Sequence, residues 1–211
     1  MSQADTALKP LHVDVAGGNL AAVMEPGTGA FTIVLMHDLG GDLDTMLPLL
    51  ACLPLPEAHR IAVDLPNHGL SCDCPEGEET AIIGAWLDEL AKRGWGPFVL
   101  AASGSSSAVA WQLAACDNIA GICLISPAEG TGNVEHLPRA IPLIAFVAGG
   151  SPDRMASWQR YRARARGQWL SVSTTATHEQ LLAFDPDVRA QVASHLAGFA
   201  REAYMLSLQS T

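Results

Sequence analysis

The sequence predicts one α/β domain, residues 1–211, built on a mostly parallel sheet that helices cover on both faces. Apolar runs of strand length alternate with segments of helical periodicity, which is the pattern of strand–helix–strand units. The runs are continuously apolar, as strands buried on both faces are. Hydrophobic residues make up 49% of the chain and charged residues only 16%, a composition that supports a large core. We therefore expect an ordered domain without a linker or an internal repeat.

The chain is expected to begin with an antiparallel hairpin. The strands HVDV and LAAVM flank the turn residues 17–19, GGN, a residue combination typical of hairpin turns. FTIVLMH then predicts a buried strand that ends in a glycine-rich loop. Residues 43–54 predict a short helix, and HRIAVDLP predicts the next buried strand.

The remaining elements alternate regularly. Residues 78–93 place apolar side chains at helical spacing, and Gly94 ends this helix. PFVLAA predicts the next strand, which leads into a tight turn and helix at SGSSSAVAWQLAA. Later strands are expected at GICLISP, PLIAFVAGG and QWLSVST, and later helices at residues 153–166 and 187–206.

Charge and composition exclude several classes of function. Twelve Lys and Arg against 22 Asp and Glu give a net charge of −10, which disfavours a nucleic-acid groove because phosphate binding needs a positive surface. No apolar run reaches the roughly 18–20 residues of a membrane span, and the start MSQADTALKP has no secretory-signal pattern. The five cysteines, an odd number, suggest reduced thiols. We expect a cytoplasmic protein that takes a small-molecule substrate or ligand, with no nucleic-acid or membrane partner. The sequence leaves the oligomeric state open.

One cysteine pair and one cluster of basic residues bear on metal and anion binding. Cys72 and Cys74 form a CxC pair, but no second pair is spaced to complete a tetrahedral site, so no metal is expected. Five of the 12 basic residues gather between positions 154 and 166. They form either the solvated face of a helix or an anion-binding patch.

Polar and glycine-rich segments follow five of the predicted strands. In an open α/β sheet the active site lies beyond the carboxyl ends of the strands, so these segments are the candidates for chemistry. They are HDLGG (37–41), DLPNHGLS (64–71), SGSSS (103–107), GGSPD (149–153) and TATH (175–178).

In this order the motifs resemble those of the α/β-hydrolase superfamily, in its small form without a cap domain. HDLGGD is similar to the family's HGxGG oxyanion loop, and DLPNHGLS to its DxxGHGxS segment. FVLAASGSSSAVAWQLAA resembles the strand, turn and helix of the nucleophile elbow. GSPD stands where the family has its acid, and THEQLLAFDPDV where it has its catalytic histidine. The resemblance implies a carboxylic ester or thioester hydrolase with a shallow open site and no cofactor.

The elbow departs from the family pattern G-x-S-x-G at its central position. The helix that follows aligns residues 102–106 with that pattern and puts Gly104 where the nucleophilic serine stands. Glycine suits the strained backbone of the turn, but it has no side chain that could attack a carbonyl group. With a shifted register Ser105 or Ser103 would be the nucleophile. Otherwise both hydroxyl groups cap the helix that begins near Ser106.

The resemblance also implies roles for other residues. His178, in a loop after the last strand, would be the general base. Asp153 would orient its imidazole, or would be the N-cap or a first-turn residue of the helix at 153–166. The backbone N–H groups of Leu39 and Ser105 would form an oxyanion hole.

The loop around Leu39 adds further candidate binding residues. Gly40 belongs to the expected oxyanion loop, whereas His37 and His68 match family positions that mainly hold loops together. Asp38 is a second departure, because the family usually has glycine there. A carboxylate that pointed inward would oppose the negative charge that develops in an oxyanion hole. The alternatives are that Asp38 points away, or that it binds a cationic group or a water molecule.

Three functions remain open at this point, and with them whether the protein is an enzyme. The first is acyl transfer through Ser105 or Ser103 with His178 and Asp153. The second is a non-covalent enzyme in which His178, held by Asp153, removes a proton from water or from the substrate. The third is a hydrolase-like binding protein without catalysis, since Gly104 stands at the nucleophile position.

Overall fold

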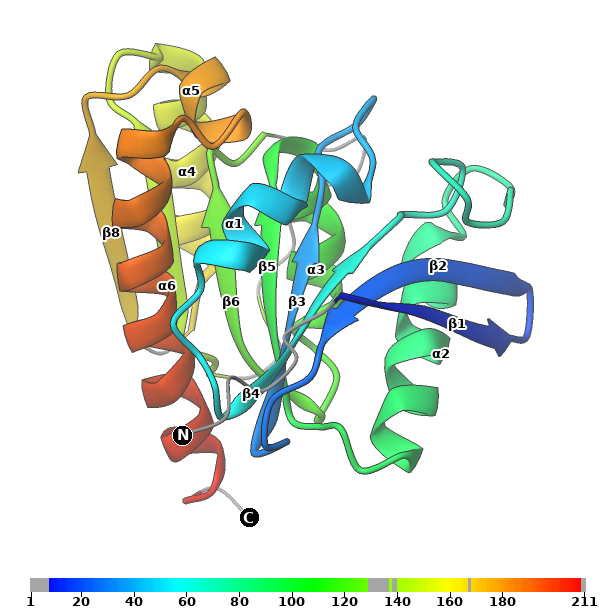
Figure 1. Cartoon of the computed structure of the whole chain (residues 1–211). Coiled ribbons are helices and arrows are strands. Elements are labelled where there is room, and N and C mark those ends of the chain that lie inside the picture. Colours follow the sequence, from blue (N-terminus) through cyan, green and yellow to red (C-terminus); the bar gives the residue numbers. More distant parts are fainter. Residues whose placement is uncertain (1–7, 129–136, 138–139, 167, 210–211) are drawn as a thin grey trace.

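The computed structural model describes residues 8–128, 137, 140–166 and 168–209 and is centred on an eight-stranded sheet (Figure 1). The strand order is β1-β2-β4-β3-β5-β6-β7-β8. The β1–β2 and β2–β4 pairs are antiparallel, and the pairs from β4 to β8 are parallel. The predicted mostly parallel α/β sheet with an antiparallel N-terminal pair is therefore confirmed. The strands are β1 (Lys9–Val15), β2 (Gly18–Glu25), β3 (Phe31–Met36), β4 (Ala58–Val63), β5 (Phe98–Ser103), β6 (Ile119–Ile125), β7 (Leu143–Ala148) and β8 (Trp169–Thr174).

The helices follow the predicted segments with two differences. The helix expected at 43–54 consists of a 3-10 turn, η1 (Leu43–Met46), followed by α1 (Leu47–Cys52). A short helix, α5 (His178–Leu182), occupies a segment that was predicted as loop. Thr177 explains it, because Thr177 and Gln180 form a reciprocal capping box at its start. The others are α2 (Glu79–Lys92), η2 (Gly104–Ser106), α3 (Ser107–Leu113), α4 (Pro152–Arg164) and α6 (Pro186–Ser207).

The hairpin turn lies one residue earlier than expected. Val15 pairs with Gly18, so Ala16 and Gly17 form the two-residue turn, and Gly18 already belongs to β2. Gly17, the second turn residue, has a φ of +105°, a conformation that glycine adopts without steric cost.

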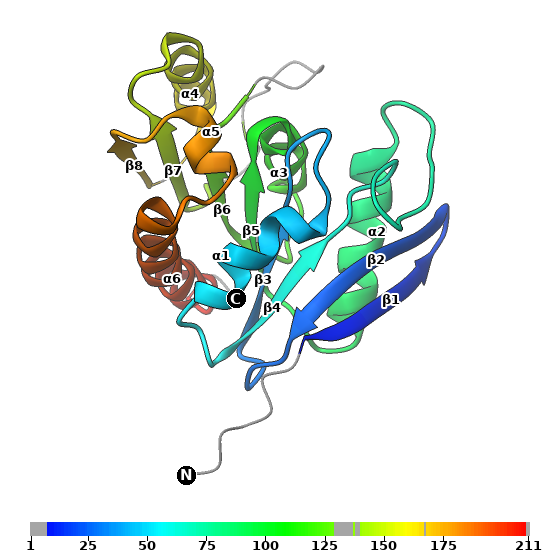
Figure 2. The same cartoon turned by 45° about the horizontal axis from the view of Figure 1, so that its top comes forward.

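Helices pack on both faces of the sheet and bury two apolar layers. The helices α2, α3 and α4 cover one face, and α1, α5 and α6 cover the other (Figure 2). Their apolar side chains belong to two separate buried clusters, one on each face. The central strands β3, β5, β6 and β7 are buried along their whole length, which is why their sequences are apolar runs without alternation. No helix in the described part of the chain combines the length and the apolarity that a membrane span requires.

The topology brings the candidate segments to one edge of the sheet. The strands β3, β5, β6, β7 and β8 run parallel, so their carboxyl ends lie together at the edge where α5 and the start of α4 are found (Figure 1). The segments that follow these strands, loops or the first turns of helices, carry Asp38, Gly104, Ser126, Arg154 and His178.

Candidate active site

The turn after β5 has the geometry of a nucleophile elbow with glycine at its apex. Ser103 ends the strand, Gly104 adopts φ +55°, and the helical segment η2–α3 follows at once. A Cβ atom at position 104 would overlap the carboxyl group of Asp38. The left-handed backbone conformation favours glycine at this position, and the close approach of the carboxylate leaves no room for a side chain.

The Asp38 carboxylate accepts the hydrogen bonds that an oxyanion hole would offer to a substrate. Its Oδ1 atom accepts from the backbone N–H of Ser105 at 2.7 Å and from that of Leu39 at 2.8 Å. The Ser105 hydroxyl donates to the same oxygen at 2.6 Å. The other carboxylate oxygen, Oδ2, has no hydrogen bond within the described residues. Of the orientations considered for Asp38, the structure has the inward one.

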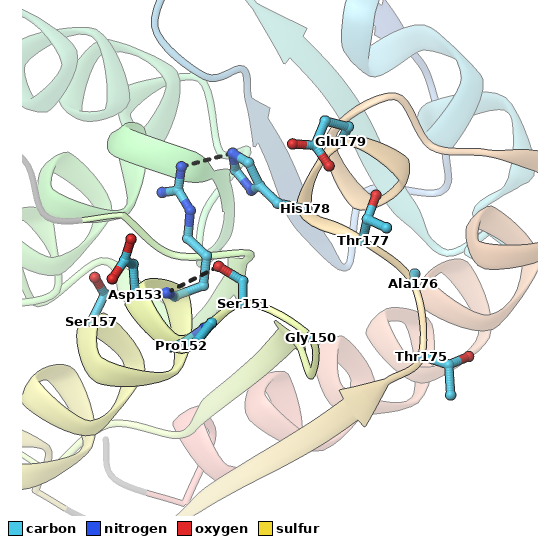
Figure 3. Close-up of a pocket in the computed structure, with 11 residues that line it drawn as sticks. Gly150, Ser151, Pro152, Asp153, Ser157, Thr175, Ala176, Thr177, His178 and Glu179 are labelled. Atoms are coloured by element: carbon cyan, nitrogen blue, oxygen red, sulfur yellow. Dashed lines mark hydrogen bonds between the residues drawn. The ribbon is translucent and has the colours of Figure 1, made fainter.

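His178 is held as a neutral imidazole by two neighbours. Arg154 Nη2 lies 2.7 Å from Nε2 of His178 (Figure 3), and because a guanidinium can only donate, Nε2 is the acceptor. The proton therefore resides on Nδ1, which donates to Ser126 Oγ at 2.7 Å. Burial and the Arg154 cation lower the pKa of His178, against the opposing charges of Asp38 and Glu179. At neutral pH the ring is uncharged.

Ser126 takes the place at Nδ1 that Asp153 was expected to fill. Its backbone is left-handed, with φ +47°, and its N–H donates to the carbonyl oxygen of Phe146 at 2.7 Å. Asp153 is exposed and, within the described residues, forms no hydrogen bond with His178. In Figure 3 its carboxylate lies apart from the imidazole, beside Ser157. Ser151 is the N-cap of α4, and Asp153 lies in the first turn of this helix, which is one of the two helix positions considered for it.

Among the hydrogen bonds of the described residues, none joins Ser103 or Ser105 to His178. Ser105 donates its hydroxyl proton to Asp38. Ser103 is buried, and its hydroxyl faces the Met46 sulfur at 3.9 Å. Neither hydroxyl caps a helix in the described chain, because the N-cap positions of η2 and α3, Ser103 and Ser106, make no side-chain cap hydrogen bond.

His37, Gly40 and His68 fix the loop that carries Asp38. The Nδ1 of buried His37 lies 2.7 Å from the Asp38 carbonyl oxygen, and its Nε2 accepts from Leu65 N–H at 3.0 Å. Burial lowers the pKa of His37, consistent with a neutral ring that donates at one nitrogen and accepts at the other. The Gly40 N–H lies at 3.5 Å from Nε2 of His68.

Two open hollows flank this centre. One, of about 510 Å³, is lined by His178, Arg154, Asp153 and Glu179 among others. The second, of about 520 Å³, includes Leu39 and Ser105 and has a mainly apolar lining from Leu65, Ile83 and Val109. No cluster of three or more His, Cys, Asp or Glu side chains suited to a metal ion occurs in the part of the chain that the structure describes.

Sequence reasoning missed two residues of this centre, Ser126 and Arg154. Ser126 follows β6 directly. It therefore lies beyond the carboxyl end of a parallel strand, as the predicted candidates do. Arg154 was noted only as one of a group of arginines on a helix. Its neighbour Asp153 was selected instead, because the resemblance directed attention to an acid at that point.

The sequence matches no family model and no curated protein. Solved structures match over nearly the whole chain. An esterase from Pyrococcus furiosus has a TM-score of 0.75 at 12% identity, covering 94% of this chain and 91% of its own. A protein described as a predicted CIB-like hydrolase from Thermoplasma acidophilum has a TM-score of 0.70 at 14% identity, with coverages of 91% and 99%. The bottromycin epimerase BotH, solved with bottromycin A2, has a TM-score of 0.67 at 18% identity, with coverages of 90% and 100%.

Proposed function

The chain has the α/β-hydrolase fold, and we propose that it uses this fold for non-covalent acid–base catalysis on a small carbonyl compound. One observation carries the proposal: Asp38 Oδ1 accepts both backbone N–H groups beside Gly104. Gly104 places no attacking atom at the nucleophile position. The two backbone N–H groups that would stabilise an acyl-transfer intermediate already donate to the Asp38 carboxylate.

Magnitudes weigh against acyl transfer in this arrangement. Loss of a single oxyanion-hole donor costs about 10²–10³ in turnover, and here both donors are engaged by a carboxylate. The Asp38 charge itself would oppose the oxyanion of a tetrahedral intermediate. Proton transfer next to a carbonyl group needs no nucleophile and forms no tetrahedral intermediate.

His178 is the base in this proposal. A proton from the substrate would pass to Nε2, and the imidazolium formed would be stabilised by the nearby Asp38 carboxylate and by the Nδ1–H hydrogen bond to Ser126. The electron pair left on the substrate would move onto its carbonyl oxygen, and return of the proton would complete the exchange. A neutral imidazole near pH 7 suits this task, because it can accept a proton without first losing one.

A related fold supports a reaction other than hydrolysis. BotH is described as an epimerase, so a protein of similar structure carries an activity outside ester cleavage. This likeness concerns the fold, and the assignment to the present chain depends on Asp38, Gly104 and His178.

Deuterium incorporation tests the proposal directly. The protein is incubated in D₂O with 2-oxobutanoate or with the N-acetylcysteamine thioester of propionate, and loss of the proton next to the carbonyl group is followed by NMR. We expect incorporation above the buffer rate with at least one compound, reduced about 100-fold in His178→Gln. Glu89→Gln, a surface change on α2, is the control for general effects. Incorporation that is unchanged in His178→Gln would overturn the proposal.

Ester or thioester hydrolysis through Ser105 is the second candidate. The observation in its favour is the 2.6 Å hydrogen bond from Ser105 Oγ to Asp38 Oδ1, since a carboxylate at that distance could take the hydroxyl proton. Labelling with a fluorophosphonate and peptide mapping of residues 97–118 separates the two. Modification of Ser105 that is lost in Asp38→Asn would establish this second candidate, whereas the proton-transfer proposal expects no labelling.

A further inference from the structure

Arg154 is a cation in the candidate site that has no anionic partner among the described residues. Its side chain is half-buried at the start of α4, and its guanidinium donates to the neutral imidazole of His178 at 2.7 Å. Within the described part of the chain no carboxylate lies within ion-pair distance of it. An arginine carries five donors and pairs most strongly with a carboxylate or phosphate. Toward the residues that the structure describes, most of the donor capacity of this guanidinium is therefore unused.

The same guanidinium covers the atom that the proposed chemistry needs. Nε2 is the acceptor nitrogen of His178, and Arg154 occupies it. A substrate must therefore draw Arg154 away before His178 can act as a base. A neutral substrate offers the guanidinium no stronger partner than the imidazole, whereas an anionic group does.

Resting on the proposed function, we propose that the substrate carries a carboxylate group that pairs with Arg154 and thereby uncovers Nε2 of His178. The hollow of about 510 Å³ lined by both residues is open to solvent and large enough for a small acid. Substrate binding then also activates His178, because the Arg154 guanidinium leaves Nε2 when it pairs with the substrate carboxylate.

The surrounding charges favour a monoanion over phosphate. Asp153 and Glu179 line the same hollow, and the charge of Asp38 also reaches His178. Each of these carboxylates repels an anion. A doubly charged phosphate gains about twice the attraction to Arg154, but it also meets about twice the repulsion from all three carboxylates. One arginine among three acidic groups is therefore better matched to a single negative charge.

NMR of the His178 imidazole tests this proposal without any turnover. The probes are sodium butyrate, its neutral analogue butyramide, and inorganic phosphate, each titrated at constant ionic strength. We expect butyrate to bind saturably, to shift the His178 ring resonances and to raise the pKa of His178, because the Arg154 cation leaves Nε2. Butyramide is expected to bind at least about tenfold more weakly, since it forms no charge-assisted pair.

Variants on one helix provide the matched comparison. Arg154→Gln is expected to weaken butyrate binding by about tenfold or more and to remove the His178 response. Arg162→Gln is the control, because Arg162 lies on the same helix but stacks over the Trp169 ring at 4.1 Å. If Arg154→Gln unfolds, the comparison of butyrate with butyramide on the unaltered protein still shows whether binding requires the negative charge of the carboxylate.

Three results would overturn the inference: equal binding of butyrate and butyramide, an unchanged His178 resonance at saturation, or phosphate binding tighter than butyrate. The two proposals can fail separately. Butyrate binding as expected, without deuterium incorporation into any carbonyl compound, removes the proposed reaction but keeps the carboxylate site. Incorporation that depends on His178, with no role for Arg154 in binding, removes only the present inference.

Discussion

Asp38 and Gly104 both depart from the α/β-hydrolase pattern at the elbow and the loop that faces it, and they depend on each other. The Asp38 carboxylate approaches the elbow so closely that a side chain at position 104 would overlap it. Conversely, the carboxylate is held there by the N–H groups of Leu39 and Ser105. A serine side chain at position 104 and an inward carboxylate at position 38 are therefore mutually exclusive in this geometry.

A double-mutant cycle measures this dependence. Gly104→Ala is expected to lower the free energy of unfolding by about 3 kcal/mol, the sum of left-handed backbone strain of about 1–2 kcal/mol and the overlap with Asp38. In Asp38→Gly the same Gly104→Ala change is expected to cost only the backbone strain. Urea unfolding of the four proteins gives the coupling energy. A coupling energy near zero would contradict the close approach.

Rebuilding the family residues should create a reactive serine. In the double variant Asp38→Gly, Gly104→Ser the oxyanion donors are freed and a hydroxyl stands at the elbow, so we expect a fluorophosphonate to label position 104. Gly104→Ser alone is expected to remain unlabelled, because Asp38 still fills the space. Mass mapping of the elbow peptide reads the outcome. Labelling of the single variant at the same rate as the double variant would show that Asp38 moves away freely.

At the scale of elements, the loop after β4 supports the loop that carries Asp38. Asp64 Oδ1 accepts from Leu43 N–H at 2.7 Å and Oδ2 from Leu70 N–H at 2.9 Å. Asp64 is buried, so each hydrogen bond to its carboxylate contributes more than a neutral surface bond would. Through Leu43, at the start of η1, this carboxylate fixes the far end of the Asp38 loop.

Asp64→Ala tests this brace. Loss of two charge-assisted hydrogen bonds is expected to lower the free energy of unfolding by about 3 kcal/mol, measured by urea denaturation. Asp73→Ala is the control, because Asp73 is an exposed residue near the same loop and its change should stay within about 0.5 kcal/mol. Equal effects of the two substitutions would remove the bracing role of Asp64.

The helices and strands could be predicted from the sequence where burial on both faces of the sheet requires an apolar segment. β3, β5, β6 and β7 are buried on both faces, so each appears in the sequence as an apolar run. The helix α5 was missed because it has only five residues, too few for a periodic pattern, and depends on the Thr177 capping box. Side-chain direction in the site was not predictable, because the Arg154–His178 pair joins residues 24 positions apart on separate elements.

At the scale of the whole molecule, three histidines give the fold an acid sensitivity near neutral pH. Burial lowers the pKa values of His37, His59 and His178, with Arg154 adding to the effect at His178. In the unfolded chain these rings titrate near 6.5 and so bind more protons than the folded protein does just below that pH. Because the unfolded state gains protons, the free energy of unfolding falls as pH decreases below about 6.5.

Unfolding in urea between pH 7.5 and 5.5 tests this sensitivity. One histidine can change the free energy of unfolding by at most about 1.4 kcal/mol per pH unit. His37 is fully buried, so it should account for a measurable part of the total pH dependence. His37→Gln is expected to unfold more easily at pH 7.5, since its hydrogen bonds to Asp38 and Leu65 are altered, yet to show a flatter pH dependence. The pKa values of Glu57 and Glu179 are also lowered, but these carboxylates change the free energy of unfolding only below about pH 4.5. They therefore do not contribute to the slope between pH 7.5 and 5.5. A stability that stays constant from pH 7.5 to 5.5 would mean that these rings accept protons as readily in the folded protein as in the unfolded chain.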